Sequence, residues 1–265
     1  MRRRALAVTL AAFALACASA TKSVKPGESV GIPLGFHTSI KLSANLYRPQ
    51  GDGPFPAVVL MHDCPGVETM QLQVAKLLSD SGYVTLVVDS LSGRHVFDLC
   101  DDPDRKSPTA SERVEDAVAA KEYLSSLAFV DSNHIGLVGW AHGGVTALMT
   151  WAGESYAAAG FTPYAAVVAY YPYCLPVNLD SVGPLLILIG EADDWVPAEL
   201  CQDLVKTAAT AHGRDASIAI YPRATHRFDG NDNAYYMGHL YARDTAATRD
   251  SHERLLAFFD RTLKK

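Results

Sequence analysis

Short apolar runs alternate along the chain with longer segments whose apolar residues recur every three or four positions. Such runs are typical of strands buried on both faces, and such segments are typical of amphipathic helices. Two alternating segments, 29–34 and 39–47, predict a hairpin at a sheet edge, and the runs predict strands at 55–61, 83–88, 134–138, 165–171, 185–189 and 217–221. Helices are predicted at 70–78, 110–127, 142–151, 198–211 and 251–263. We therefore expect one α/β domain over residues 29–265, with a mostly parallel sheet flanked by helices.

Residues 1–20 have the pattern of a secretory signal peptide. Three arginines at positions 2–4 precede the apolar run 5–16, and the small residues 18–20 form a cleavage site. Residues 21–28 then form a short polar tether. We expect an exported protein, either periplasmic or secreted. The alternatives are a buried N-terminal helix, or lipoprotein processing that would leave a lipid anchor on Cys17.

The balance of charge is acidic. The formal net charge is −6, and removing residues 1–20 deletes three arginines and no acid, which brings it to −9. An acidic protein without a basic cluster is a poor partner for nucleic acid or anionic membranes. After the N-terminus no apolar stretch is long enough to span a bilayer, so we expect no transmembrane anchor.

Four cysteines remain after the signal peptide, Cys64, Cys100, Cys174 and Cys201. They allow three full pairings in an oxidising compartment, and the sequence does not choose among them. Cys100 and Cys174 could pair with each other or stay reduced. No cysteine pair or histidine cluster has the spacing of a zinc site, so we expect no metal. The loop at 90–108 carries four aspartates, which we interpret as solvated, with calcium binding as an alternative.

The segment Gly139–Gly144 follows a predicted strand and opens a predicted helix. Its glycines allow the sharp turn of a nucleophile elbow, which lifts the middle residue above the sheet. The middle residue is Ala141, where a nucleophile elbow carries Ser or Cys. An ordinary tight strand-to-helix turn is the alternative interpretation.

Two further loops carry residues that would complete a catalytic triad with the elbow. Asp193 follows a late predicted strand and His226 follows the last one, with Asp194 as an alternative acid. Elbow, acid and histidine in this order are typical of α/β-hydrolases. The loop after the strand 55–61 would supply the backbone N–H of Cys64 to an oxyanion hole, and His142 would supply the second N–H.

These motifs together resemble the dienelactone hydrolase family. The matching segments are 62–66, 88–94, 130–140, 190–197, 225–228 and 244–259, so that the resemblance runs from about residue 29 to residue 263. It implies an α/β-hydrolase that cleaves a small ester or lactone through a Cys or Ser nucleophile, with no cofactor. Asp193 would orient the base His226, and Asp63 would stand where founding members carry a glutamate that contacts the nucleophile.

Ala141 departs from the family pattern, because a methyl group cannot attack an acyl carbon. We expect the chain to be inactive or nearly so by the family route. The alternatives are a natural ligand-binding pseudoenzyme, an engineered substitution, or hydrolysis by Cys64 or by a water activated by His226. Trp140 and Trp195 could shape an acyl pocket or pack in the core. Arg94 could bind a substrate carboxylate or pair with nearby acids.

Overall fold

The computed structural model describes residues 27–35, 39–100, 108–153, 161–174, 183–231 and 233–264. The predicted signal peptide and most of the predicted tether lie outside these residues, as do three of the four loop aspartates, Asp101, Asp102 and Asp104. Among the helices of the described ranges, none combines the length and the hydropathy of a membrane span.

Eight strands form one sheet in the order β1-β2-β4-β3-β5-β6-β7-β8. Strands β3 to β8 pair in parallel, and the antiparallel β1 and β2 extend the sheet beyond β4. Their bounds are β1 (Glu28–Pro33), β2 (Lys41–Tyr47), β3 (Phe55–Met61), β4 (Val84–Asp89), β5 (Val130–Trp140), β6 (Ala166–Tyr170), β7 (Leu185–Gly190) and β8 (Ala216–Tyr221). The predicted single α/β domain with a mostly parallel sheet is confirmed, with its edge hairpin and its parallel centre.

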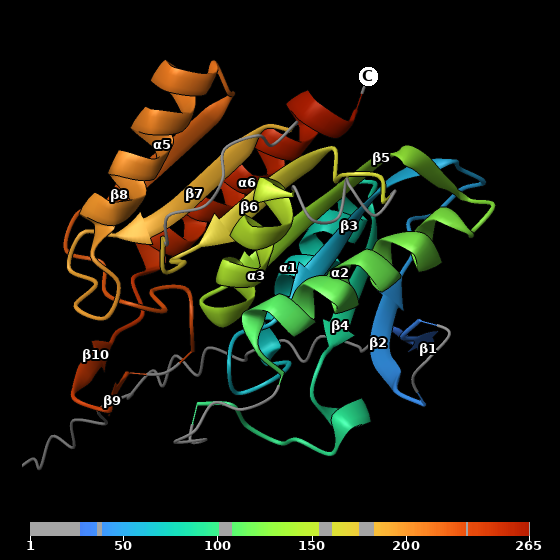
Figure 1. Ribbon diagram of the computed structural model, residues 1–265, viewed down its shortest axis with the longest axis horizontal. Helices are drawn as coiled ribbons and strands as arrows, with labels where there is room; N and C mark the ends of the chain where they lie inside the picture. Colours follow the sequence, from blue (N-terminus) through green and yellow to red (C-terminus); the bar gives the residue numbers. More distant parts are fainter. Residues whose placement is uncertain are drawn as a thin grey trace, which may run out of the picture.

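The helices cover both faces of this sheet. They are α1 (Thr69–Asp80), α2 (Ala110–Ser125), α3 (His142–Ala152), α5 (Ala198–His212) and α6 (Thr245–Leu263), with a short 3-10 helix η1 (Ser92–Arg94). In Figure 1, α2 and α3 lie over one face, and α1 and α6 lie behind the other. Most of β3 and the second half of β5, from Ile135 to Trp140, are buried between these layers, which is why these stretches are largely apolar.

Several boundaries differ from the predicted ones for local reasons. Helix α6 begins at Thr245 rather than at residue 251, because the Asp244 side chain accepts the N–H groups of Ala246 and Ala247 and so caps the helix. A small hairpin, β9 (Ala234–Tyr236) and β10 (His239–Tyr241), was not predicted, since three-residue strands carry too little periodicity. The described part of the predicted surface loop, residues 90–100, is partly buried, with Leu99 only 3% exposed.

Two disulfides join the four cysteines. Cys64 bonds to Cys100, and Cys174 bonds to Cys201. The pairing of Cys100 with Cys174 that the sequence left open is therefore wrong. The first bridge ties the loop after β3 to the loop after η1, and the second ties the loop after β6 to α5.

Candidate active site

Ala141 occupies a strained turn between β5 and α3. Its backbone angles are φ 45° and ψ −108°, a region that residues with a Cβ rarely adopt. The neighbouring glycines permit this turn, since a Cβ on Gly139 would lie 2.0 Å from the Gly143 carbonyl oxygen. The Ala141 N–H donates to the carbonyl of Tyr170 at 3.0 Å, which fastens the turn to β6. The backbone is that of a nucleophile elbow, although residue 141 has no reactive atom.

Asp193 and His226 meet beside this turn. His226 Nδ1 lies 2.7 Å from Asp193 Oδ2, and both side chains are almost fully buried. The other carboxylate oxygen accepts the N–H groups of Trp195 and Val196, which fixes the carboxylate in place. Because a carboxylate only accepts, His226 donates from Nδ1 to Asp193. The alternative acid, Asp194, is half exposed and contacts His239 instead.

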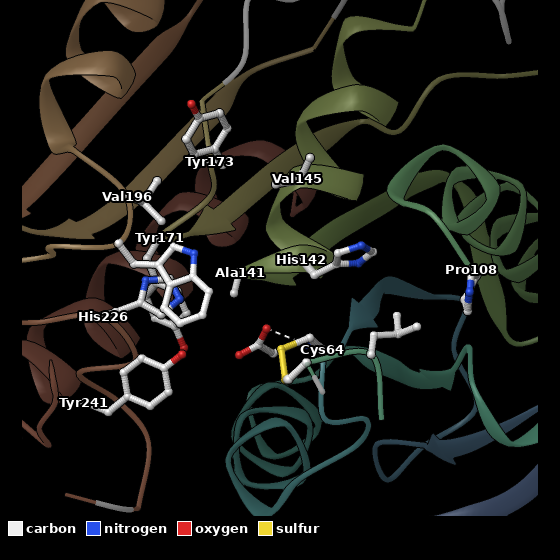
Figure 2. A pocket seen from close by; sticks show the side chains of 14 residues that line it. Cys64, Pro108, Ala141, His142, Val145, Tyr171, Tyr173, Val196, His226 and Tyr241 are labelled. Carbon is white, nitrogen blue, oxygen red and sulfur yellow. Dashed lines mark hydrogen bonds between the residues drawn. A yellow bond between two sulfur atoms is a disulfide. The ribbon is translucent and has the colours of Figure 1, made fainter. Parts of the chain in front are cut away.

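A cavity of about 370 Å³ opens above the turn. Ala141, His226 and Trp195 line one part of it, and Asp63 and Cys64 line another. Figure 2 shows Ala141 between the ring of His226 on one side and the disulfide of Cys64 on the other. The Trp195 ring stacks on His226. The volume is that of a site for a small organic molecule. Trp195 thus reaches the cavity, as one interpretation of the sequence held.

The loop that carries Cys64 is held differently from the expected oxyanion hole. The Cys64 N–H donates to Oδ1 of Asp63 at 2.5 Å, so a carboxylate already occupies one of the two expected donors. The other expected donor belongs to His142, the first residue of α3. Asp63 also faces Arg227, with 3.5 Å between Oδ2 and Nη1. A ligand oxygen that is to reach the Cys64 N–H must therefore displace the Asp63 carboxylate.

The His62 side chain stabilises this loop through two hydrogen bonds. Its Nδ1 donates to the Asp63 carbonyl at 2.5 Å, and its Nε2 accepts the Ser90 N–H at 3.1 Å. Arg113 adds a bond to the His62 carbonyl at 2.6 Å. Burial, aided by the nearby Arg113 charge, lowers the pKa of His62 well below its usual value. The neutral ring is thus a fixed support for the peptide that ends in the Cys64 N–H.

Arg113 also orients His142. The guanidinium is fully buried, and its Nη1 lies 2.8 Å from His142 Nδ1. Since a guanidinium only donates, His142 must accept at Nδ1. Burial lowers the pKa of Arg113 to about 10, against the opposing effect of Asp116. His142 lines the cavity, so the buried arginine fixes the orientation of a side chain in the site.

Two residues proposed for substrate binding lie elsewhere. Arg94 pairs with Asp116 through two bonds of 2.6 and 3.0 Å, which realises the alternative of pairing with nearby acids. Trp140 is fully buried, donates from Nε1 to Asp229 and stacks on Tyr170. Neither side chain lines the described cavity. Trp140 directly precedes Ala141 in sequence, but its side chain is buried against Asp229 and Tyr170, which sequence position alone does not reveal.

Two contributors were assigned no role from the sequence. Asp229 accepts the hydroxyl of Tyr171 at 2.7 Å, and the Tyr171 ring packs edge-on against His226 with centroids 4.7 Å apart. Arg227 pairs with Glu68 at 2.6 Å as well as with Asp63. Asp229 lies in a Gly- and Asn-rich segment that looks like an ordinary turn, so only the fold shows its buried position.

One chemical alternative from the sequence is contradicted by the structure. Cys64 is in a disulfide, and a disulfide sulfur is not a nucleophile, so the proposed attack by Cys64 is wrong for this oxidised form. Within the described ranges, no group of three His, Cys, Asp or Glu side chains could hold a metal ion.

Comparison with known proteins gives one consistent result. A model of the dienelactone hydrolase family matches residues 42–263. A protein from a Bradyrhizobium species, named "Probable 2-oxo-3-(5-oxofuran-2-ylidene)propanoate lactonase", is 29% identical over 198 residues, 70% of this chain and 78% of that protein.

Solved structures share the fold. A dienelactone hydrolase-like promiscuous phosphotriesterase from metagenomic libraries has a TM-score of 0.75 at 20% identity, over 89% of this chain and 97% of that one. A dienelactone hydrolase from Anabaena variabilis has a TM-score of 0.66 at 21% identity, over 89% of this chain and 98% of that one. The predicted resemblance is confirmed, and the chain belongs to the dienelactone hydrolase family.

Proposed function

We propose that this protein binds a small carboxylic ester or lactone in the geometry of a hydrolase, and that the chain as given turns it over slowly or not at all. The observation that carries the proposal is Ala141 itself. It keeps the strained backbone of an elbow, with φ 45°, at the floor of a cavity beside a histidine–aspartate pair. The alanine side chain does not require this strained backbone conformation. The strain therefore indicates that the turn is kept for the geometry of the site.

Asp193 and His226 are the acid–base pair of this proposal. With Nδ1 bonded to Asp193, His226 can take a proton at Nε2 from a nucleophile and return it to a leaving group. A serine or cysteine at position 141 would complete the triad. Losing the nucleophile of such a triad costs on the order of 10⁶ in turnover and leaves on the order of 10³ over water.

A ligand-binding protein without turnover is the second candidate. It is favoured by the Cys64 N–H, which donates to Asp63 and so is engaged rather than open to an oxyanion. A binding protein requires the cavity and its walls but not an open oxyanion hole. Hydrolysis by a water that His226 activates is a third route, for which the cavity next to His226 leaves space.

Turnover of p-nitrophenyl acetate by the given chain, by Ala141→Ser and by Ala141→Gly separates these candidates. We expect background rates for the given chain and the glycine control, and a large gain for the serine variant. If the given chain hydrolyses and His226→Ala abolishes this, the water route is right. If no variant hydrolyses any small ester or lactone, the hydrolase frame is wrong and the binding candidate stands.

We also propose that the protein is exported, with cleavage after residue 20, on the strength of residues 1–20. The two disulfides support an oxidising compartment. The mass of the mature protein from expressing cells tests this, since processing as a lipoprotein would leave a lipidated Cys17 instead.

A further inference from the structure

A second cavity of about 250 Å³ lies beside the first. The two share Cys100 and Tyr241 in their walls, so they are neighbouring parts of one depression. Asp98 and Cys100 line the second cavity together with Tyr235 and Tyr236 of the β9–β10 hairpin. We call this second cavity the hairpin subsite.

The hairpin is built onto the loop that carries His226. His226 and Tyr241 form a parallel β-bridge, and the Ala242 N–H donates to Thr225 Oγ1 at 2.9 Å. The hairpin subsite is therefore positioned by the same segment that positions the histidine. A ligand in the first cavity that extends past His226 meets this hairpin next.

Aromatic rings connect the two cavities. Trp195 stacks with His226 at 5.9 Å between centroids, and Tyr236 is nearly parallel to Trp195, with 5.9 Å and 5°. Tyr241 lies within 6.2 Å of Trp195 and 6.1 Å of Tyr236. Tyr235 is 78% exposed although it lines the subsite. Such ring faces and edges attract another planar ring more than a saturated group of equal size.

The leaving group of an ester must lie on this side of the cavity. His226 returns its proton to the leaving oxygen, so that oxygen is within hydrogen-bond reach of Nε2. The alcohol part of the ester, rather than its acyl part, therefore points toward Trp195 and the hairpin.

Charges in the hairpin subsite favour an uncharged group. Glu68 and Asp98 line it together with Arg227, and Arg227 is already paired with Glu68 at 2.6 Å. The Asp63 carboxylate, which also pairs with Arg227, further offsets the positive charge of the guanidinium. A negatively charged ring would face two carboxylates and one neutralised guanidinium, so a carboxylate on the ring would weaken binding.

We propose that the hairpin subsite binds an uncharged aromatic ring on the alcohol part of the ester, which makes arylalkyl esters the substrate class of this site. Tyr236 is the specificity-determining residue, because its ring is parallel to Trp195 and borders the subsite. This inference rests on the proposed hydrolase geometry.

Rates with matched esters test it in the Ala141→Ser background. 2-Phenylethyl acetate should exceed 2-cyclohexylethyl acetate in kcat/KM about fivefold, mostly through KM, as expected for one aromatic contact. Tyr236→Leu should reduce the ratio to about one, and Tyr236→Phe should retain it. Phe97→Leu is the matched control, since Phe97 is 89% exposed outside the subsite and should leave the ratio unchanged. A 4-carboxyl group on the phenyl ring should raise KM.

A ratio near one in the Ala141→Ser variant, or a ratio that Tyr236→Leu leaves unchanged, would overturn the proposal. If the serine variant hydrolyses no ester, the proposed function fails. The proposed ring preference of the hairpin subsite is then tested by binding measurements alone. Isothermal titration of the given chain should then show 2-phenylethanol binding more tightly than 2-cyclohexylethanol, with the preference lost in Tyr236→Leu. Equal affinities for the two alcohols would reject the subsite independently of turnover.

Discussion

The His226 side and the Cys64 side of the cavity differ in whether their expected catalytic groups are available. On the His226 side, Asp193 holds the imidazole through Nδ1, which leaves Nε2 as the ring nitrogen that can take up a proton. On the Cys64 side, the expected oxyanion donor is bonded to the Asp63 carboxylate, and a disulfide to Cys100 anchors the loop. The first side is ready for proton transfer, whereas the second is occupied by a group of the protein itself.

This difference means that Ala141 is not the sole obstacle to catalysis. A serine at position 141 would restore a nucleophile to the side that is already assembled. Developing negative charge on the acyl oxygen would still compete with Asp63 for the Cys64 N–H. The variants below separate the two sides.

The largest effect should come from His226. In the Ala141→Ser background, His226→Ala should abolish the gain that serine brings, on the order of 10⁶ for a complete triad, because nucleophile and base act as a unit. In the given chain the same change should alter ester hydrolysis little. Initial rates with p-nitrophenyl acetate check both. Equal losses in the two backgrounds would mean that His226 does not serve residue 141.

Substitution of Asp193 should have the second largest effect, again in the Ala141→Ser background. Asp193→Asn should lower kcat on the order of 10⁴-fold, since the amide favours the wrong imidazole tautomer. Asp194→Asn is the matched control, and it should change kcat less than about twofold, because Asp194 is half exposed and faces His239. If the two substitutions have similar effects, Asp193 is not the orienting acid.

Asp63 tests the other side, again in the Ala141→Ser background. Asp63→Ala releases the Cys64 N–H and should raise kcat about tenfold, part of the 10²- to 10³-fold value of one oxyanion donor. Asp63→Asn keeps an acceptor and should gain less. The values of kcat for the variants are compared with p-nitrophenyl acetate at saturating concentration. A lower kcat in Asp63→Ala would show that the carboxylate moves aside on binding or assists the reaction.

His62 gives the smallest effect, on stability rather than rate. Its pKa is well below 6.5 in the folded protein, so the unfolded chain binds one more proton as pH falls below about 6.5. The free energy of unfolding should therefore fall with decreasing pH by about 1.4 kcal/mol per unit from this group. His62→Asn should remove that part of the slope in urea unfolding between pH 6.5 and 5. Parallel curves for the two proteins would contradict a neutral, buried His62.

The sequence predicted much of this frame. Continuous apolar runs located the six parallel strands, and the glycines around Ala141 located the elbow, because close backbone approach leaves space for no other residue there. Chain order placed Asp193 and His226 on loops at one edge of the sheet, where the structure brings them within 2.7 Å.

What the sequence could not predict depends on side-chain direction. Arg94 and Trp140 were assigned to substrate binding, but their side chains bond to Asp116 and Asp229. The bond from the Cys64 N–H to Asp63 depends on a loop conformation that the Cys64–Cys100 disulfide and His62 support, and no sequence periodicity indicates it. The β9–β10 hairpin is too short for a pattern and takes its place from the His226 loop.

Covalent labelling tests the central claim most directly, that an assembled acid–base pair faces residue 141, a position that lacks a nucleophile. The given chain, Ala141→Ser, and Ala141→Ser combined with His226→Ala would be treated with a phosphonofluoridate and weighed intact by mass spectrometry. We predict one phosphonyl adduct at position 141 in the serine variant alone. A folded serine variant that stays unlabelled, or a given chain that labels equally, would contradict the account.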